Sequence, residues 1–229
     1  MLNNVFRVIS TLSIVATLLF ATGCTQKASD VQATVAEAYS NYVDVTLSKK
    51  EIQDIPYASA YLKIGTQKQV FVVLAFAETN PLNGAEQLKW VSADKAMIVT
   101  ENGRIVKTLG LMGDNLIGVE GELPSVVDMR ATSISVNYSW MPGYRYDFPA
   151  VLSSSKQGQE LVTTPIYSID TQVINERIVF PSINKYITNT YWVDSSGQVK
   201  KSRQYLGPDM VAVEMTILKP FKSKQEVSK

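Results

Sequence analysis

The chain has 229 residues, of which 45% are hydrophobic and 19% are charged, so it can bury the core of one globular domain. Its 22 Lys and Arg nearly balance its 21 Asp and Glu, which argues against nucleic acid as a partner. It contains no histidine, which excludes Ser-His-Asp and Cys-His catalysis, His-based zinc sites and an imidazole pH switch.

The N-terminus has the pattern of a bacterial export signal that ends at a cysteine able to carry lipid. Arg7 is followed by an apolar run at residues 8–20, by three small residues and then by Cys24. A membrane-spanning helix needs about 20 apolar residues, whereas a basic start, a short apolar core and a small-residue cleavage site are the marks of a secretory signal. We therefore predict a signal peptide at residues 1–23 and lipidation of Cys24.

An ordinary signal peptidase site is the alternative at this boundary. The lipoprotein pattern usually has Leu three residues before the cysteine, and this chain has Ala21 there. Ordinary cleavage would leave Cys24 as a free thiol, and as the only cysteine it cannot form an internal disulfide. Acylation would hold the domain at a membrane, because each buried acyl CH₂ contributes about 0.8 kcal/mol and stable anchoring takes more than one chain.

Residues 24–29 form a short polar tether, and an amphipathic helix is predicted at residues 30–46. Ser29 or Asp30 would cap this helix. Apolar residues then recur at steps of three and four, namely Val31, Val35, Tyr39, Tyr42 and Val43. Packing on the domain is the favoured interpretation. A partner-binding or membrane-lying helix is the alternative, and the polar side, which is acidic and has no basic residue, argues against contact with anionic lipid.

After Pro56 the pattern changes to strands. Residues 57–64 and 88–92 are predicted strands, and residues 80–84 are a loop. Residues 70–77 are continuously apolar and rich in β-branched side chains, which predicts a central strand buried on both faces.

A hairpin at residues 97–108 is the clearest local signal. Asn102 and Gly103 supply the two positive-φ positions of a type I′ turn. The predicted cross-strand pairs are Glu101 with Arg104, Thr100 with Ile105, and Val99 with Val106.

The second half of the chain also consists of short strands and turns. Loops are predicted at residues 109–124 and 153–158, the former with short strands, and a frayed basic tail at residues 221–229. Strands are predicted at residues 132–140, 174–180, 186–193, 198–206 and 210–218, with a continuation after the bend at 144–148. The fold class is therefore all-β: one antiparallel barrel-like or sandwich domain over residues 30–220 with one N-terminal amphipathic helix.

No specific catalytic set is present. The chain lacks a dinucleotide fingerprint, a phosphate loop, a nucleophile elbow and a cysteine cluster, so we expect no catalytic residue, metal or cofactor. A pair of Asp or Glu residues could hydrolyse a glycoside, but only if the carboxyl groups lie about 5 to 9 Å apart, which the sequence does not show.

Aromatic residues are unusually dense at residues 138–146. Trp140, Tyr144, Arg145 and Tyr146 are the candidate contacts for a glycan or a protein partner, because aromatic faces stack on sugars and anchor interfaces. Packing in the core is the alternative for the same aromatic residues.

Several segments resemble the YjbF/GfcB family of lipoproteins. They are DIPYA at 54–58, KWVSAD at 89–94, TENGRIVKTLGL at 100–111, WMPGYRY at 140–146 and SRQYL at 202–206. The resemblance implies an all-β barrel-like domain and an accessory lipoprotein of group 4 capsule or related exopolysaccharide systems. It also implies an outer-membrane barrel protein or periplasmic secretion proteins as partners, and it brings no catalytic residues.

The expected function is that of a membrane-anchored periplasmic accessory lipoprotein, which docks envelope partners during capsule or exopolysaccharide secretion or assembly. Thr25 after Cys24, where Asp would favour retention, indicates the outer membrane, with the domain facing the periplasm. A glycan-binding module that uses the surface aromatics is the alternative, and a carboxylate-based enzyme acting on polysaccharide is less favoured.

Overall fold

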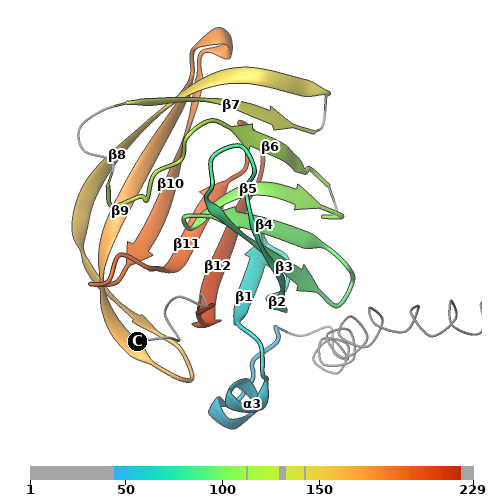
Figure 1. Ribbon diagram of the computed structural model, residues 1–229, viewed down its shortest axis with the longest axis vertical. Coiled ribbons are helices and arrows are strands. Elements are labelled where there is room, and N and C mark those ends of the chain that lie inside the picture. Colours follow the sequence, from blue (N-terminus) through green and yellow to red (C-terminus); the bar gives the residue numbers. More distant parts are fainter. Residues whose placement is uncertain (1–43, 112, 129–132, 142, 223–229) are drawn as a thin grey trace, which may run out of the picture.

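The strands of the protein curl into one nearly closed antiparallel barrel, as the computed structural model shows for residues 44–111, 113–128, 133–141 and 143–222 (Figure 1). The described strands form one 12-stranded sheet in the order β5-β4-β3-β2-β1-β12-β11-β10-β9-β8-β7-β6. They are β1 (Ser59–Ile64), β2 (Val70–Thr79), β3 (Glu86–Ser92), β4 (Met97–Glu101), β5 (Arg104–Leu109), β6 (Leu116–Glu120), β7 (Ile134–Trp140), β8 (Arg145–Thr163), β9 (Ser168–Phe180), β10 (Lys185–Val193), β11 (Val199–Tyr205) and β12 (Ala212–Lys219).

This order explains why the predicted all-β fold is a barrel and not a sandwich. Sequence neighbours pair along the sheet, apart from β5 and β6, and β1 pairs with β12. The two remaining edges, β5 and β6, then meet at a seam (Figure 1). Buried Thr108 bridges that seam, since its Oγ1 accepts a hydrogen bond from the Leu116 amide at 2.9 Å and lies 3.2 Å from Oδ1 of Asn115.

The outer face of β1 and β2 is covered by a second, smaller core. Alternate residues of β1 point to opposite faces, so Leu62 joins the main interior cluster while Tyr61 joins the outer one. Helix α3 (Lys49–Asp54) supplies the fully buried Ile52 to the outer cluster. The helix begins at Ser48, which forms a capping box with Glu51 and so satisfies two terminal amide groups.

The structure corrects the predicted N-terminal helix at its end. Residues 44–46 are not helical: the Val45 amide donates to the Gln69 carbonyl at 3.0 Å, and the Gln69 amide donates to Asp44 at 2.6 Å. These bonds hold residues 44 and 45 in an extended conformation beside Gln69, at the start of β2. A helical segment could not form this backbone pairing. Residues 30–43 of the prediction lie outside the described residues. Helix α3 itself was not predicted.

The predicted loop at residues 153–158 was wrong, because these residues belong to the 19-residue strand β8. β8 pairs with β7 only as far as Leu152, and it continues with β9 alone to Thr163. Its exposed part is polar for that reason, and a polar stretch is easily mistaken for a loop. Gln172 Nε2 donates to the carbonyls of Gln157 and Gly158, which stabilises the register shift in this part of the hairpin.

The predicted hairpin is confirmed except at one pair. Asn102 and Gly103 have φ of 49° and 81°, and Glu101 pairs with Arg104 as predicted. A register shift beyond Thr100 pairs Val99 with Lys107, so the predicted Val99–Val106 pair was wrong. The shift leaves Val106 as an extra residue in β5, and both Ile105 and Val106 are buried in the main core.

Only about half of the apolar run at residues 70–77 is buried, whereas the whole run was predicted to be buried on both faces. Residues 71–74 are buried, whereas Phe76 is 54% exposed. The reason is that β1 accompanies β2 only as far as Val73, beyond which β2 has lost the neighbour that covers it.

At the other end of the chain, Phe221 packs against the main core, and residues 223–229 lie outside the described residues. Within the described residues, no helix is long and apolar enough to cross a membrane.

Replacing Thr108 with Val tests the seam. Val has the same shape but accepts no hydrogen bond, so the buried Leu116 amide loses its partner, and the free energy of unfolding should fall by about 1–3 kcal/mol. Urea unfolding measures the change. Thr188→Val, at an exposed position of β10, is the matched control and should change stability little. An equal effect of both substitutions would show that the hydroxyl of Thr108 does not hold the seam.

Candidate functional site

The turns of an antiparallel barrel alternate between its two ends, and the candidate sites lie at opposite ends. The β7–β8 end carries the turns that follow the odd-numbered strands, including Gly143 and Tyr144. The β4–β5 end carries α3, the Asn102-Gly103 turn and the β10–β11 turn, together with the exit of β12.

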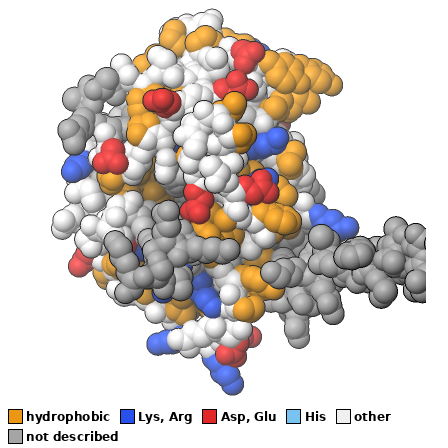
Figure 2. Space-filling view, viewed as in Figure 1, with side chains coloured by type: hydrophobic (Ala, Val, Ile, Leu, Met, Phe, Trp, Pro, Cys, Tyr) orange, Lys and Arg blue, Asp and Glu red, His pale blue; other side chains and the backbone are white. Residues whose placement is uncertain are grey.

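The sequence-predicted aromatic residues separate into core and surface. Trp140 is 4% exposed, and its ring lies 5.0 Å from that of Phe148 and 5.5 Å from that of Phe180. Tyr144 and Tyr146 are 73% and 54% exposed. Figure 2 shows hydrophobic side chains projecting at the upper right of the molecule, where β7 turns into β8 in Figure 1.

Arg145 stays with the two tyrosines at the surface. Its guanidinium lies 5.7 Å from the ring centroid of Phe148, which in turn contacts Trp140. The structure therefore brings Tyr144, Arg145 and Tyr146 together on one exposed turn. Trp140 supports this turn from the core and, together with Arg145, lines a hollow beside it.

A hollow of about 340 Å³ lies beside this turn and carries charges of both signs. Arg145 and Lys185 line it together with Asp114 and Asp209. Lys185 forms an ion pair with Asp209, so one of the two carboxylates is already engaged by a cation. The arrangement offers a mixed-charge surface, and no group of acidic residues among the described residues could hold a metal ion.

A second cavity, of about 260 Å³, opens at the β4–β5 end. Its inner part is apolar, with Trp90 and Met215 buried in the core. The indole N–H of Trp90 donates to Oγ1 of Thr100 at 2.9 Å, which satisfies the polar atom of a buried ring. Exposed or half-buried polar residues surround the opening, namely Glu86, Asn102, Ser125 and Gln198, whereas the polar lining residue Ser202 is buried.

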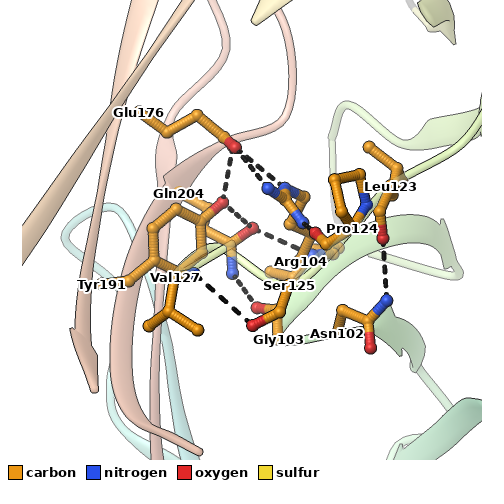
Figure 3. A network of polar contacts seen from close by, with 11 residues as sticks. Asn102, Gly103, Arg104, Leu123, Pro124, Ser125, Val127, Glu176, Tyr191 and Gln204 are labelled. Carbon is orange, nitrogen blue, oxygen red and sulfur yellow. Dashed lines mark hydrogen bonds and ion pairs between the residues drawn. The ribbon is translucent and has the colours of Figure 1, made fainter. Parts of the chain in front are cut away.

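A buried ion pair fixes the position of this end of the barrel (Figure 3). Nη2 of Arg104 lies 2.8 Å from Oε1 of Glu176, and both side chains are almost inaccessible to solvent. Arg104 also donates through Nε to the same oxygen at 2.9 Å and through Nη1 to the Pro124 carbonyl. The hydroxyl of Tyr191 lies 3.1 Å from Oε2 of Glu176, so both carboxylate oxygens have partners.

Gln204 extends the network to the turn itself. Its Oε1 accepts from the Ile105 amide at 2.9 Å, and its Nε2 donates to the Gly103 carbonyl at 3.0 Å (Figure 3). The turn approaches β11 so closely that a Cβ on Gly103 would lie 2.4 Å from Cγ2 of Val199. Position 103 therefore requires glycine both for its positive φ and for this contact.

The network also sets the protonation of its members. Burial alone would lower the pKa of Arg104, but the Glu176 carboxylate raises it, and the net pKa lies above the ordinary value. Burial raises the pKa of Tyr191 well above its ordinary value, and Glu176 raises it further. At neutral pH Arg104 is thus charged and Tyr191 is neutral, as a donated hydrogen bond to a carboxylate requires.

Glu101, which lies across the Asn102-Gly103 turn from Arg104, is bound by three side-chain amides. Glu101 is buried, and its carboxylate accepts from Asn80 at 3.0 Å, from Asn83 at 2.7 Å and from Gln87 at 3.0 Å. The two charges that flank the turn therefore bind other elements of the barrel. Glu101 anchors the β2–β3 connection, and Arg104 anchors the opposite wall.

Comparison with known proteins identifies the family. The model of "Group 4 capsule polysaccharide lipoprotein gfcB, YjbF" matches residues 31–218. The chain belongs to the YjbF family. It is 36% identical over 212 residues to the uncharacterized lipoprotein GfcB of Escherichia coli strain K12, which covers 88% of this chain and 94% of that one. It is also 36% identical over 187 residues to the uncharacterized lipoprotein YjbF of the same organism, over 78% and 82% of the two chains.

A solved structure confirms the fold of this YjbF family member. The crystal structure of the hypothetical lipoprotein YmcC from Escherichia coli K12 matches with a TM-score of 0.70 and 30% sequence identity. The match covers 88% of this chain and all of that one. The expected family and the barrel-like fold are therefore confirmed, and the chain is a capsule-associated lipoprotein of the cell envelope.

Sequence reasoning missed the cavity at the β4–β5 end. Its lining comes from four strands, β3, β4, β11 and β12, and from connections and a C-terminal segment that are distant in the chain, and no motif marks such a set. The available signal was the Asn102-Gly103 turn, which was interpreted only as a hairpin connection.

Replacing Arg104 with Met tests the buried pair. The variant leaves Glu176 as an uncompensated buried charge, so the free energy of unfolding should fall by about 3–5 kcal/mol. Replacing both residues with Met should restore much of that loss, because a buried ion pair gains little over apolar side chains of similar volume. Urea unfolding of the single and double variants measures both effects.

Lys185→Met is the matched control, since it breaks the exposed pair with Asp209 and should cost no more than about 1 kcal/mol. If Arg104→Met costs no more than this control, the buried pair does not hold the barrel as described.

Proposed function

We propose that this protein is a membrane-anchored accessory lipoprotein of capsule or exopolysaccharide secretion or assembly, which acts by docking other proteins of the envelope. Membership of the YjbF family supports the capsule association. The docking role rests on one observation, the exposed β7–β8 turn with Tyr144, Arg145 and Tyr146.

The composition of this turn suits a protein interface. Tyrosine and arginine are enriched among the residues that contribute most binding energy, because they bury much area and keep a polar group for hydrogen bonding. Three such side chains lie on consecutive positions here, and two of them expose more than half of their surface. An isolated exposed tyrosine would need no explanation, but here two tyrosines and an arginine are exposed at consecutive positions.

The turn is also held in a defined shape. Tyr144 and Asp147 have φ of 52° and 54°, a conformation that is uncommon for residues other than glycine and more unusual for Tyr than for Asp. The Asp147 amide donates to Oγ of Ser139 at 3.1 Å, and Trp140 fills the core beneath. A preformed surface loses less conformational entropy on binding than a flexible surface does.

The proposed membrane anchor is a lipid on Cys24. Cys24 lies outside the described residues, and its lipidation and the outer-membrane location remain part of this proposal. The export signal and the family of lipoproteins support lipidation, and Thr25 after Cys24 supports the outer membrane. With two or more acyl chains on Cys24, the soluble barrel would stay at the membrane, where its partners are also concentrated.

A non-catalytic role is part of the same proposal. The two buried glutamates have structural partners: Glu176 binds Arg104 and Tyr191, and Glu101 binds three amide groups. The carboxylates beside the β7–β8 turn, Asp114 and Asp209, share their hollow with two cations. Neither arrangement resembles a protonated acid beside a free carboxylate, which glycoside hydrolysis requires.

Cys24→Ala tests the anchor. The native protein should sediment with membranes after cell lysis, whereas the variant should be recovered in the soluble periplasmic fraction, and capsule or matrix output should fall. Fractionation with immunoblotting measures the first effect, and polysaccharide quantification the second. Mass spectrometry that finds an unmodified thiol on the processed native protein would contradict lipid anchoring.

Replacing both Tyr144 and Tyr146 with Ala tests docking. Removal of two interface anchors should reduce recovery of co-purifying envelope proteins about tenfold or more, as expected for a loss of at least one strong contact. Quantitative mass spectrometry of pull-downs from cross-linked detergent extracts measures this. Tyr186→Ala, which removes an equally exposed tyrosine from β10, is the control and should have no effect. Unchanged recovery with the double variant would exclude the turn as the docking surface.

A further inference from the structure

We propose that the cavity at the β4–β5 end is a binding site for a neutral sugar residue. This inference rests on the proposed capsule function for the source of its ligand, but the chemistry of the site comes from the cavity itself. It also places glycan recognition at the end of the barrel opposite to the aromatic turn.

The size and the inner walls of the cavity suit one sugar ring. A cavity of about 150 Å³ accommodates benzene in another protein, so about 260 Å³ leaves room for a six-membered ring with its hydroxyl groups. Leu88, Trp90, Ile217 and Phe221 supply apolar walls. Such walls contact the C–H faces of a sugar, which are its apolar surfaces.

The rim supplies the complementary polar groups. Asn102 and Gln198 carry planar amides that both donate and accept, and Ser125 and Ser202 carry hydroxyls with the same versatility. Sugar hydroxyls need donors and acceptors together, because each one also donates and accepts. Asn102 Nδ2 already donates to the Leu123 carbonyl at 2.7 Å, and the Ser202 hydroxyl accepts from Gln204 Nε2 at 2.9 Å, so a sugar would use the other hydrogen-bonding positions of these groups.

The charge of the lining selects against acidic sugars. Among the described residues that line this cavity, Glu86 is the one ionisable side chain, and Lys and Arg are absent from the set. A uronic acid would bring its carboxylate toward Glu86 with no cation to compensate. The hollow at the opposite end differs, because it contains two cationic side chains, Arg145 and Lys185, beside its two carboxylates.

The site is held in place before any ligand arrives. The three amides on the Glu101 carboxylate fix the β2–β3 connection that leads into Glu86. Gln204 fixes the Asn102-Gly103 turn and donates to Oγ of Ser202 at 2.9 Å. Glu86, the Asn102-Gly103 turn and Ser202 are thus anchored to the barrel wall. These groups therefore lose little conformational freedom when a ligand binds.

The test uses the full-length lipidated protein in nanodiscs, which avoids detergents that carry sugars. Glucose, galactose and their two uronic acids are titrated by calorimetry, and saturation-transfer NMR reports which sugar protons contact the protein. The neutral sugars should bind saturably, and the uronic acids should bind about tenfold more weakly at pH 7. Glu86→Gln should bring the uronic acids to within about threefold of the neutral sugars, because it removes the charge and keeps the shape.

Two variants locate the binding. Ile217→Trp should abolish it by filling the cavity, with circular dichroism to confirm folding. Gln198→Ala, at an exposed rim position where folding is not at risk, should weaken it about threefold or more. The double Ala variant of Tyr144 and Tyr146 should bind sugar as the native protein does, which separates this site from the docking turn.

The outcomes are distinguishable from those of the proposed function. Uronic acids that bind as tightly as neutral sugars, an absence of saturable sugar binding, or displacement of the probe by an acyl chain alone would each overturn the sugar site. Failure of the pull-down with intact sugar binding would overturn docking and leave the site standing.

Discussion

The ion pair between Arg104 and Glu176 is the interaction on which the arrangement of this barrel depends. It joins β5, at one edge of the sheet, to β9, which is eight places away in the strand order. Removing two charges from water costs several kcal/mol for each ion, and only close geometry with additional hydrogen bonds offsets that cost. Here Pro124, Tyr191 and Gln204 complete the network, so the pair is stable in one arrangement of the walls and costly in any other.

This constraint positions one of the two candidate surfaces, and the aromatic core positions the other. At one end it holds the Asn102-Gly103 turn against β11, which gives the cavity a fixed mouth with amides on its rim. At the other end the core that surrounds Trp140 holds the β7–β8 turn, which exposes two tyrosines and an arginine. A rigid barrel that presents different chemistry at its two ends is well suited to an accessory role between a polymer and a protein partner. The proposed lipid on Cys24 would keep both surfaces near the membrane.

Local features could be predicted from the sequence, and contacts between distant residues could not. The Asn102-Gly103 turn was predicted because two adjacent residues determine it, and the flanking pair of Glu101 with Arg104 followed from it. The true partners of these two charges were not predictable, since Glu176 lies 72 residues from Arg104. The same limit applies to barrel closure, which requires β1 to pair with β12 and the seam at Thr108 to form. Trp140 was ambiguous because strand alternation gives no indication of which face is inside, and the polar part of β8 resembled a loop because β9 alone accompanies it. The family resemblance supplied the capsule association, which no local pattern contains.

Native-state hydrogen exchange at the Ile105 amide tests the central claim most directly, because this amide donates to Gln204 inside the network. If the network unites the two walls, this amide exchanges only through global unfolding, with the same opening free energy as amides in the β1–β12 pair. Exchange of Ile105 through a much smaller local opening, while the β1–β12 amides remain protected, would show that the network is not what holds the barrel together.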